Sequence, residues 1–289
     1  MESSEEWIHA HCRPTGPAEV VRHRVWATTT RIPTADGPVW FKRCAESHRF
    51  EAGLVASLAR GRPDLLPRVL ACEATRGWLL TADAGTSLRQ LGNPPELWRR
   101  LLPRYAELQR DSSVPRDVPD RTLPRWPELY EDLAASELPL EPEEAERLRD
   151  HAPRFEALCE ELAGHGLPAT VQHDDLHDTN TFADGDSLRI ADWGDASLSH
   201  PFVSLVVTFR FLEERDGLDP ADGWFATLRD AYLEPWGTGL VEAFELAERL
   251  GRFVHAFGWA SLRRLLPPEV RPEYDVPYRI VLRRALAVA

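Results

Sequence analysis

Two short stretches in the middle of the chain decide the fold: His173-Asp174-Asp175-Leu176-His177-Asp178-Thr179-Asn180 and, a little further on, Ile190-Ala191-Asp192-Trp193-Gly194. Between them, a β-type run, the turn Asp184-Gly185-Asp186 and a second β-type run predict a hairpin. The turn lies close to the midpoint between Asn180 and Asp192. Residues equidistant from the turn of an antiparallel pair face each other at roughly 5 Å. We therefore expect Asn180 and Asp192 to lie side by side at the open end of the hairpin.

These two side chains outline a magnesium site. Mg²⁺ prefers oxygen ligands and usually takes only one or two from the protein, while phosphate and water supply the rest. Asp175, on the preceding loop, should reach the same edge without being needed as a ligand. A third carboxylate beside a metal-bound triphosphate is well placed to accept the proton of an attacking hydroxyl.

The pattern His-x-Asp-x-x-x-x-Asn, with a further Asp twelve residues on, resembles the catalytic loop and metal-binding Asp of the aminoglycoside phosphotransferase and choline kinase superfamily. That superfamily is distantly related to protein kinases. The resemblance implies that Asp175 is the catalytic Asp and that Asn180 and Asp192 are the Mg²⁺ ligands. It also implies that His173 braces the catalytic loop. Asp192-Trp193-Gly194 is similar to the Asp-Phe-Gly of protein kinases.

The first eighty-odd residues read as strands with one helix. Phe50, Leu54 and Leu58 recur every four residues and should line one face of that helix. Three strands precede it and two follow it, which predicts a small antiparallel sheet with one covering helix. The expected strands are Val20 to Trp26, Thr29 to Thr34, Val39 to Lys42, Val69 to Glu73 and Trp78 to Thr81.

Kinases of this type need a Lys on the third strand to hold the α/β-phosphates and a Glu on the next helix to orient it. Lys42 ends the third expected strand, and Glu51 lies in the helix that follows. Taken alone they would be an ordinary surface ion pair worth under about a kcal/mol. Together with the His173–Asp192 pattern, however, they match the family. The resemblance therefore implies that Lys42 and Glu51 bind the nucleotide.

The chain has no glycine-rich Gly-x-Gly-x-x-Gly loop over the phosphates. We expect a turn at Ala27-Thr28-Thr29-Thr30, where the hydroxyls of Thr28 and Thr29 and backbone N–H groups would grip the ATP phosphates. Backbone groups near Thr81 to Asp83 should hold the adenine, by analogy with the family.

After residue 86 helical patterns dominate, at 95–110, 142–164, 202–215, 221–234, 240–266 and 276–288. Pro103 and Pro153 fall inside apolar periodic stretches, so we expect kinks or breaks there. The fold class should be α+β, a two-lobed protein-kinase-like fold. Residues 1–86 would form a small antiparallel β-rich nucleotide-binding lobe with its hinge. Residues 87–289 would form a larger, mainly helical lobe carrying the catalytic loop and the acceptor site.

The composition of the chain bears on its binding partners and on its location in the cell. A formal net charge of −13 argues against nucleic acid and anionic membranes as partners. The four scattered cysteines form no Cys-x-x-Cys pair, which argues against a disulfide framework and a thiolate zinc site. No apolar stretch is long enough to span a bilayer. The acidic start, residues 1–6, lacks the features of a signal peptide. We therefore expect a cytoplasmic protein.

The expected activity is ATP- and Mg²⁺-dependent transfer of the γ-phosphoryl group to a hydroxyl of a small molecule. Three alternatives stay open. The first is a protein with the same fold that binds a nucleotide but does not catalyse phosphoryl transfer. A metal-dependent hydrolase could use His173, Asp175, His177 and Asp178 as metal ligands. A protein kinase would need a glycine-rich loop and a closing Ala-Pro-Glu, and neither is visible.

The acceptor and the oligomeric state are left open by the sequence. One hypothesis is a cationic acceptor, because carboxylates follow the metal-binding Asp192 within one expected helix. The same residues could equally solvate the end of that helix. The candidate substrate-binding residues are Asp195, Glu213, Glu214 and Asp216.

Overall fold

The computed structural model describes residues 3–113, 117–219 and 221–289, so Met1 and Glu2 at the acidic start lie outside it. The chain falls into two compact units. The first is Met1–Val118 with His177–Ala196, and the second is Pro119–Leu176 with Ser197–Ala289. The lobe boundary that the sequence suggests near residue 86 stays a prediction.

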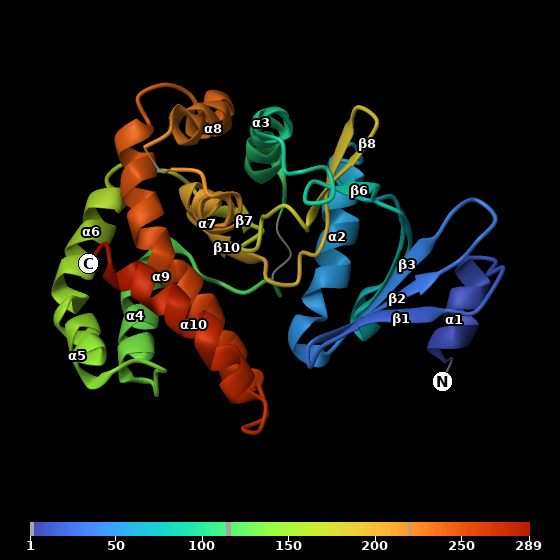
Figure 1. The fold of residues 1–289 in the computed structure, drawn as a ribbon, viewed down its shortest axis with the longest axis horizontal. Helices are drawn as coiled ribbons and strands as arrows, with labels where there is room; N and C mark the ends of the chain where they lie inside the picture. The colour runs from blue at the N-terminus through green and yellow to red at the C-terminus, as the bar shows by residue number, and fades with distance from the viewer. Residues whose placement is uncertain (1–2, 114–116, 220) are drawn as a thin grey trace. The chain divides into compact units, whose positions relative to one another are not determined.

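The first unit is built on an antiparallel sheet (Figure 1), as the sequence predicts. The strands lie in the order β1-β2-β3-β5-β4. Helix α2 (Phe50–Gly61) buries Phe50, Leu54 and Leu58, which confirms the periodicity seen in the sequence. The strands are β1 (Glu19–His23), β2 (Ala27–Ile32), β3 (Val39–Cys44), β4 (Val69–Glu73) and β5 (Trp78–Ala82).

A helix that the sequence analysis missed, α1 (Ser4–His11), packs on this sheet (Figure 1). Its Trp7 ring lies 5.8 Å from the ring of Phe41 and 5.6 Å from that of Trp78. The side chains of Ser3 and Glu6 form a capping box at its start. The Ser-x-x-Glu spacing was the available sequence signal.

The turn expected at residues 27–30 is wrong, because these residues belong to strand β2. The turn lies one step earlier, where Arg24 and Ala27 exchange backbone hydrogen bonds of 2.8 and 3.3 Å. Three consecutive threonines are β-branched and favour an extended strand over a phosphate-gripping loop.

A second sheet in the first unit joins β6 (Thr86–Ser87) to the hairpin of β8 (Thr181–Asp184) and β9 (Ser187–Ile190), in the order β6-β8-β9. Gly85 has φ of 105°, and a Cβ there would lie 2.4 Å from the Ala183 carbonyl oxygen. Only glycine lets the backbone come this close. Helix α3 (Pro95–Asp111) continues through Pro103, so it is not broken there.

The second unit is mainly helical. The predicted break at Pro153 is confirmed, since α5 ends at Asp150 and α6 begins at Ala152. The rings of Tyr130, Phe155 and Phe253 meet in its core at centroid distances of 4.4–5.3 Å. Its elements are α4 (Trp126–Ala135), which the sequence analysis missed, α5 (Pro142–Asp150), α6 (Ala152–Ala163), β7 (Thr170–Gln172), β10 (Ser197–Ser199), α7 (Leu205–Asp216), α8 (Gly223–Leu233), α9 (Val241–Leu265) and α10 (Arg271–Leu286).

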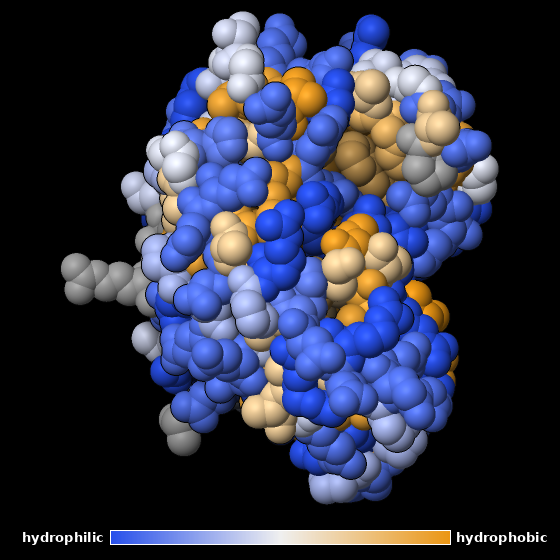
Figure 2. Space-filling model, turned by 90° about the vertical axis from the view of Figure 1, so that its left-hand side faces the viewer, coloured by the Kyte–Doolittle hydropathy of each residue, from blue (hydrophilic) through white to orange (hydrophobic). Residues whose placement is uncertain are grey.

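The face drawn in Figure 2 is largely hydrophilic, with hydrophobic residues in smaller groups. Within residues 3–113, 117–219 and 221–289, no helix has the length and apolar character needed to cross a membrane.

Candidate active site

The first unit contains a cavity of about 330 Å³ between its sheet, α2 and the β8–β9 hairpin. One part of its wall is apolar and carries side chains such as Val55, Leu79 and Ile190. Another part is charged and polar, and its residues come from β1, β3, α2 and both ends of the hairpin: Arg22, Lys42, Glu51, Asn180 and Asp192. A cavity with an apolar wall and a few convergent polar groups is the usual form of a small-molecule site.

Lys42 stands at the centre of the charged part. Its ammonium donates to Glu51 Oε1 at 2.6 Å and to Asp192 Oδ1 at 2.5 Å. Burial by itself would lower the pKa of Lys42, but the charges of Asp192 and Glu51 outweigh it and raise that pKa above its usual value. Lys42 therefore stays protonated. It is also the only lysine in the chain.

Glu51 is held in place from several sides. Its side chain is 2% exposed, and its second oxygen accepts a bond from the Cys44 thiol at 3.4 Å. Burial raises the pKa of Glu51, while the Lys42 ammonium opposes that rise. A Cβ on Gly194 would lie 3.1 Å from Glu51 Oε2. The glycine of the Asp-Trp-Gly stretch thus leaves room for this carboxylate.

The hairpin exists, but its register differs by one residue from the prediction. Thr181 pairs with Ile190, so Asn180 lies opposite Ala191, whose N–H donates to the Asn180 carbonyl at 2.9 Å. Asp192 follows with a left-handed backbone, φ 65°. The expectation that Asn180 and Asp192 face each other as a cross-strand pair is wrong. Both nevertheless line the same cavity.

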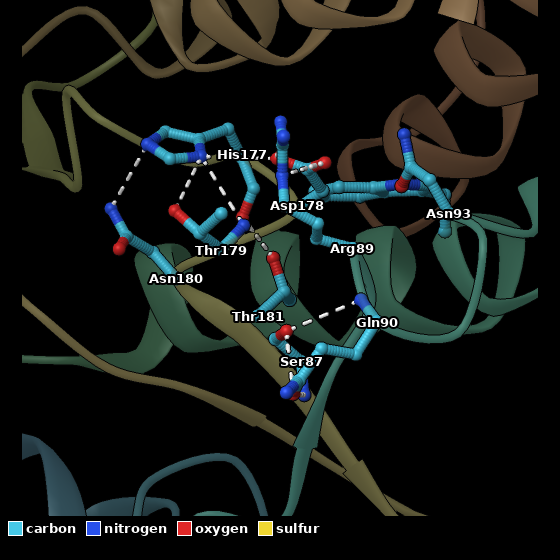
Figure 3. A network of polar contacts seen from close by, with 10 residues as sticks. Ser87, Arg89, Gln90, Asn93, His177, Asp178, Thr179, Asn180 and Thr181 are labelled. Atoms are coloured by element: carbon cyan, nitrogen blue, oxygen red, sulfur yellow. Dashed lines mark hydrogen bonds and ion pairs between the residues drawn. The ribbon is translucent and has the colours of Figure 1, made fainter.

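His177 organises the start of the hairpin (Figure 3). Its Nδ1 lies 3.3 Å from the backbone nitrogen of Thr179 and 3.1 Å from the Thr179 hydroxyl. Its Nε2 lies 3.4 Å from Asn180 Nδ2. His177 thus contacts the Asn180 side chain at the start of the hairpin, and an amide oxygen is a group that can coordinate a cation.

Asp178 forms an ion pair with Arg89. Its carboxylate, 4% exposed, accepts from Arg89 Nε at 3.0 Å (Figure 3). Among the residues that the structure describes, no group of three or more His, Cys, Asp or Glu side chains is placed to hold a metal. The Arg89 contact occupies Asp178, one of the four side chains (His173, Asp175, His177 and Asp178) that the hydrolase alternative would need as metal ligands.

The preceding loop belongs to the second unit. His173 is fully buried, and its Nδ1 accepts the backbone N–H of Asp175 at 3.3 Å. Asp174 has φ 59°, and its carboxylate accepts from Arg121 at 2.9 Å and from the Ser197 hydroxyl at 2.5 Å. Arg121 and Ser197 are residues that sequence reasoning missed.

The predicted nucleotide-binding residues divide between the two faces of the sheet. Thr29, Thr81 and Asp83 line the cavity. Thr28 lines a separate hollow next to α1, and its hydroxyl lies 2.9 Å from His23 Nδ1. Successive residues of a strand point to opposite faces, so Thr28 and Thr29 cannot act together. The Asp83 carboxylate accepts from Trp40 Nε1 and from the Gly85 N–H, both at 2.8 Å.

The candidate acceptor residues divide between the two units. Asp195 is exposed and belongs to the first unit. The others lie on α7 in the second unit, where Glu213 accepts from Arg284 at 2.7 Å and Glu214 from Arg210 at 3.1 Å. Asp216 is exposed at the end of the helix.

A model of the phosphotransferase enzyme family matches residues 31–265, whereas no curated protein matches the chain. The choline kinase LicA from Streptococcus pneumoniae is 13% identical, with a TM-score of 0.67 over 99% of this chain and 98% of that one. A choline/ethanolamine kinase family protein from Mesorhizobium loti is 16% identical, with a TM-score of 0.64 over 95% and 92%. A spectinomycin phosphotransferase solved with ADP and spectinomycin is 14% identical, with a TM-score of 0.59 over 98% and 96%.

At these identities the solved structures establish the fold, which agrees with the α+β class predicted from the sequence. The family match covers most of the chain. The chain belongs to the phosphotransferase enzyme family and has the protein-kinase-like fold of the small-molecule kinases.

Proposed function

We propose that this protein is an ATP- and magnesium-dependent kinase that transfers the γ-phosphoryl group to a hydroxyl of a small molecule. The observation that carries the proposal is the convergence of Lys42, Glu51, Asn180 and Asp192 on one cavity. These residues come from distant parts of the chain. A lysine braced by a buried glutamate, beside an amide and a carboxylate, is the set that phosphoryl transfer requires.

An apolar part and a charged part of the cavity wall would suit the two ends of a nucleotide. The adenine would lie against the apolar part, beside Leu79 and Ile190, with the backbone of Thr81 to Asp83 at its edge. The phosphates would lie at the charged end, next to Lys42 and Thr29. The spectinomycin phosphotransferase that shares this fold was solved with ADP.

Asn180 and Asp192 would hold the magnesium ion. A carboxylate and an amide oxygen on one cavity wall are the hard ligands that this cation prefers, and one or two suffice. His177, which contacts the Asn180 side chain, would hold that side chain at the cavity. When bound, Mg²⁺ would neutralise negative charge on the phosphates.

Asp175 would act as the general base. Its carboxylate takes the proton of the acceptor hydroxyl while the acceptor oxygen forms a bond to the γ-phosphorus. The bond between that phosphorus and the bridging oxygen breaks, and ADP leaves with the electron pair. His173, through its contact with the Asp175 N–H, would position the base.

For the acceptor we carry forward the cationic hypothesis. Two of the neighbouring folds are a choline kinase and a choline/ethanolamine kinase family protein, whose names point to amino alcohols. A cation would have to compete with Arg284 for Glu213 and Glu214. Alanine variants of Asp195, Glu213, Glu214 and Asp216 test this hypothesis one carboxylate at a time. A cationic acceptor held by several carboxylates should show a KM that rises between low and physiological salt, and a flat salt profile would contradict it.

Two experiments test the proposed function. The first measures ATP consumption across amino alcohols, aminoglycosides, other antibiotics and sugars. Turnover with one class would support the kinase. Tight Mg·ATP binding with no turnover on any acceptor would instead favour the non-catalytic alternative.

The second experiment measures nucleotide binding by calorimetry with and without Mg²⁺. Asp192→Asn and Asn180→Ala should weaken the Mg²⁺-dependent part of ATP binding. Asp186→Asn is the matched control, because Asp186 lies at the exposed tip of the same hairpin. If both site variants bind Mg·ATP as the wild type does, the metal assignment is wrong.

A further inference from the structure

A bulge interrupts the pairing of β1 with β2. Val20 pairs with Thr30 and Arg22 with Thr29, so Val21 is an extra residue on the β1 side. In a regular strand, residues two apart point to the same face. Val20 and Thr30 line the hollow next to α1, on the far side of the sheet from Lys42. Without the extra residue, Arg22 would point there too.

The bulge turns Arg22 to the opposite face, where it lines the cavity. Bulges often re-aim a side chain next to an active site. Arg22 now stands in one cross-strand row with Thr29 and Lys42, since Arg22 pairs with Thr29 and Thr29 pairs with Lys42. All three line the cavity.

Arg22 and Lys42 already share a partner. Arg22 Nη1 lies 3.3 Å from Asp192 Oδ2, while Lys42 Nζ lies 2.5 Å from Oδ1 of the same carboxylate. Among the described residues, Arg22 and Lys42 are the basic side chains that line the cavity, against three carboxylates from Glu51, Asp83 and Asp192. A nucleotide brings several further negative charges, and Lys42 is already shared by two carboxylates.

We infer that Arg22 is a second phosphate-binding residue, which grips the nucleotide together with Lys42 in place of a glycine-rich loop. The inference rests on the proposed function. Guanidinium groups pair with phosphate oxygens in a bidentate manner and bind them more specifically than an ammonium does. The Arg22 side chain is 54% exposed, so it can leave Asp192 when that carboxylate takes up a metal ion.

The experiment compares ATP with adenosine, which has no phosphate, by calorimetry on the wild type and on Arg22→Gln. We expect Arg22→Gln to weaken ATP binding about tenfold, as for a partly exposed hydrogen bond to a charged group. Adenosine binding should not change. Arg22→Lys should recover part of the loss. Arg24→Gln is the control, because Arg24 lies in the adjacent turn and its guanidinium donates to the His23 carbonyl.

Several outcomes would overturn the inference. ATP binding that is unchanged or tighter in Arg22→Gln would mean that Arg22 only blocks Asp192. An equal loss for ATP and adenosine, or a lowered melting temperature with the same loss, would mean a structural role. Failure of the wild type to bind any nucleotide would overturn the proposed function as well. If the wild type binds ATP and Arg22→Gln binds it equally well, only this inference is overturned.

Discussion

The Asp174 carboxylate accepts a hydrogen bond from the Arg121 guanidinium at 2.9 Å, and the two side chains are only 12% and 13% exposed. Asp174 stands between His173 and Asp175 with a left-handed backbone, φ 59°. Burial raises the pKa of Asp174, and the Arg121 charge opposes that rise. This ion pair connects the loop that carries Asp175, the proposed base, to Arg121, which lies more than fifty residues earlier in the chain.

Replacing Asp174 separates the ion pair from the backbone conformation. Asp174→Gly and Asp174→Ala both leave Arg121 without its carboxylate, which should cost about 3 kcal/mol of unfolding free energy. Alanine adds a left-handed strain of about 1 kcal/mol that glycine does not. Urea unfolding should therefore rank the wild type above the glycine variant and the glycine variant above the alanine variant. Equal stabilities of the two variants would show that the backbone there is unstrained.

Asp175→Asn should lower kcat by roughly 10²–10⁴ because it removes a general base. Its affinity for Mg·ATP should stay within a few fold, because Asp175 is assigned to the acceptor hydroxyl and not to the metal. Calorimetry and a turnover assay on the same preparation check both halves. Turnover close to that of the wild type would remove Asp175 from the mechanism.

Lys42, as the only lysine of the chain, gives a labelling test. An acyl phosphate of ADP carries its reactive carbonyl where the phosphates bind and transfers the acyl group to a nearby amine. We expect mass spectrometry to find the label on the peptide containing Lys42, with protection by ATP. A plain amine reagent should label it slowly at neutral pH, because the raised pKa keeps the amine protonated. Label confined to the N-terminal amine would contradict the phosphate site.

His200 should make the protein less stable as the pH falls from about 6.5 to about 4. Burial lowers the pKa of His200 to about 4. The unfolded chain therefore takes up a proton in this range while the folded protein does not, and stability is complete only above the unfolded pKa. The effect amounts to about 3 kcal/mol. His200 Nδ1 accepts from the Phe202 N–H, and an Asn oxygen can replace it there. Urea unfolding of His200→Asn should thus show a shallower loss between pH 7 and pH 4, whereas identical slopes would contradict this.

Local patterns predicted the sheet, α2 and most of the longer helices, because these depend on periodicity and turn residues. The hairpin register could not be read with the same certainty. Asp184-Gly185-Asp186 allows more than one turn, and the chain places Gly185 and Asp186 at the tip. A shift of one residue then moves Asn180 from Asp192 to Ala191.

The remaining site contacts depend on residues far apart in sequence. The pairing of Arg121 with Asp174 joins two segments that no local pattern connects. Arg22 was missed for a different reason, since strand alternation alone assigns it to the wrong face and only the extra residue Val21 corrects this. The α1 helix carried its signal in the Ser3–Glu6 capping box, which is short and easily passed over.

The stretch Asp192-Trp193-Gly194 combines three unlike constraints. Asp192 has φ 65°, Trp193 is fully buried and lies 6.4 Å from the Tyr105 ring, and a side chain at Gly194 would press on Glu51. A library randomised at these three positions and selected only for soluble, folded protein should therefore keep Asp, Asn or Gly at the first position and a large aromatic residue at the second. It should favour glycine at the third. Variants that fold with Asn or Gly in place of Asp192 would show that the fold needs only its left-handed backbone. The carboxylate itself would then be kept for chemistry.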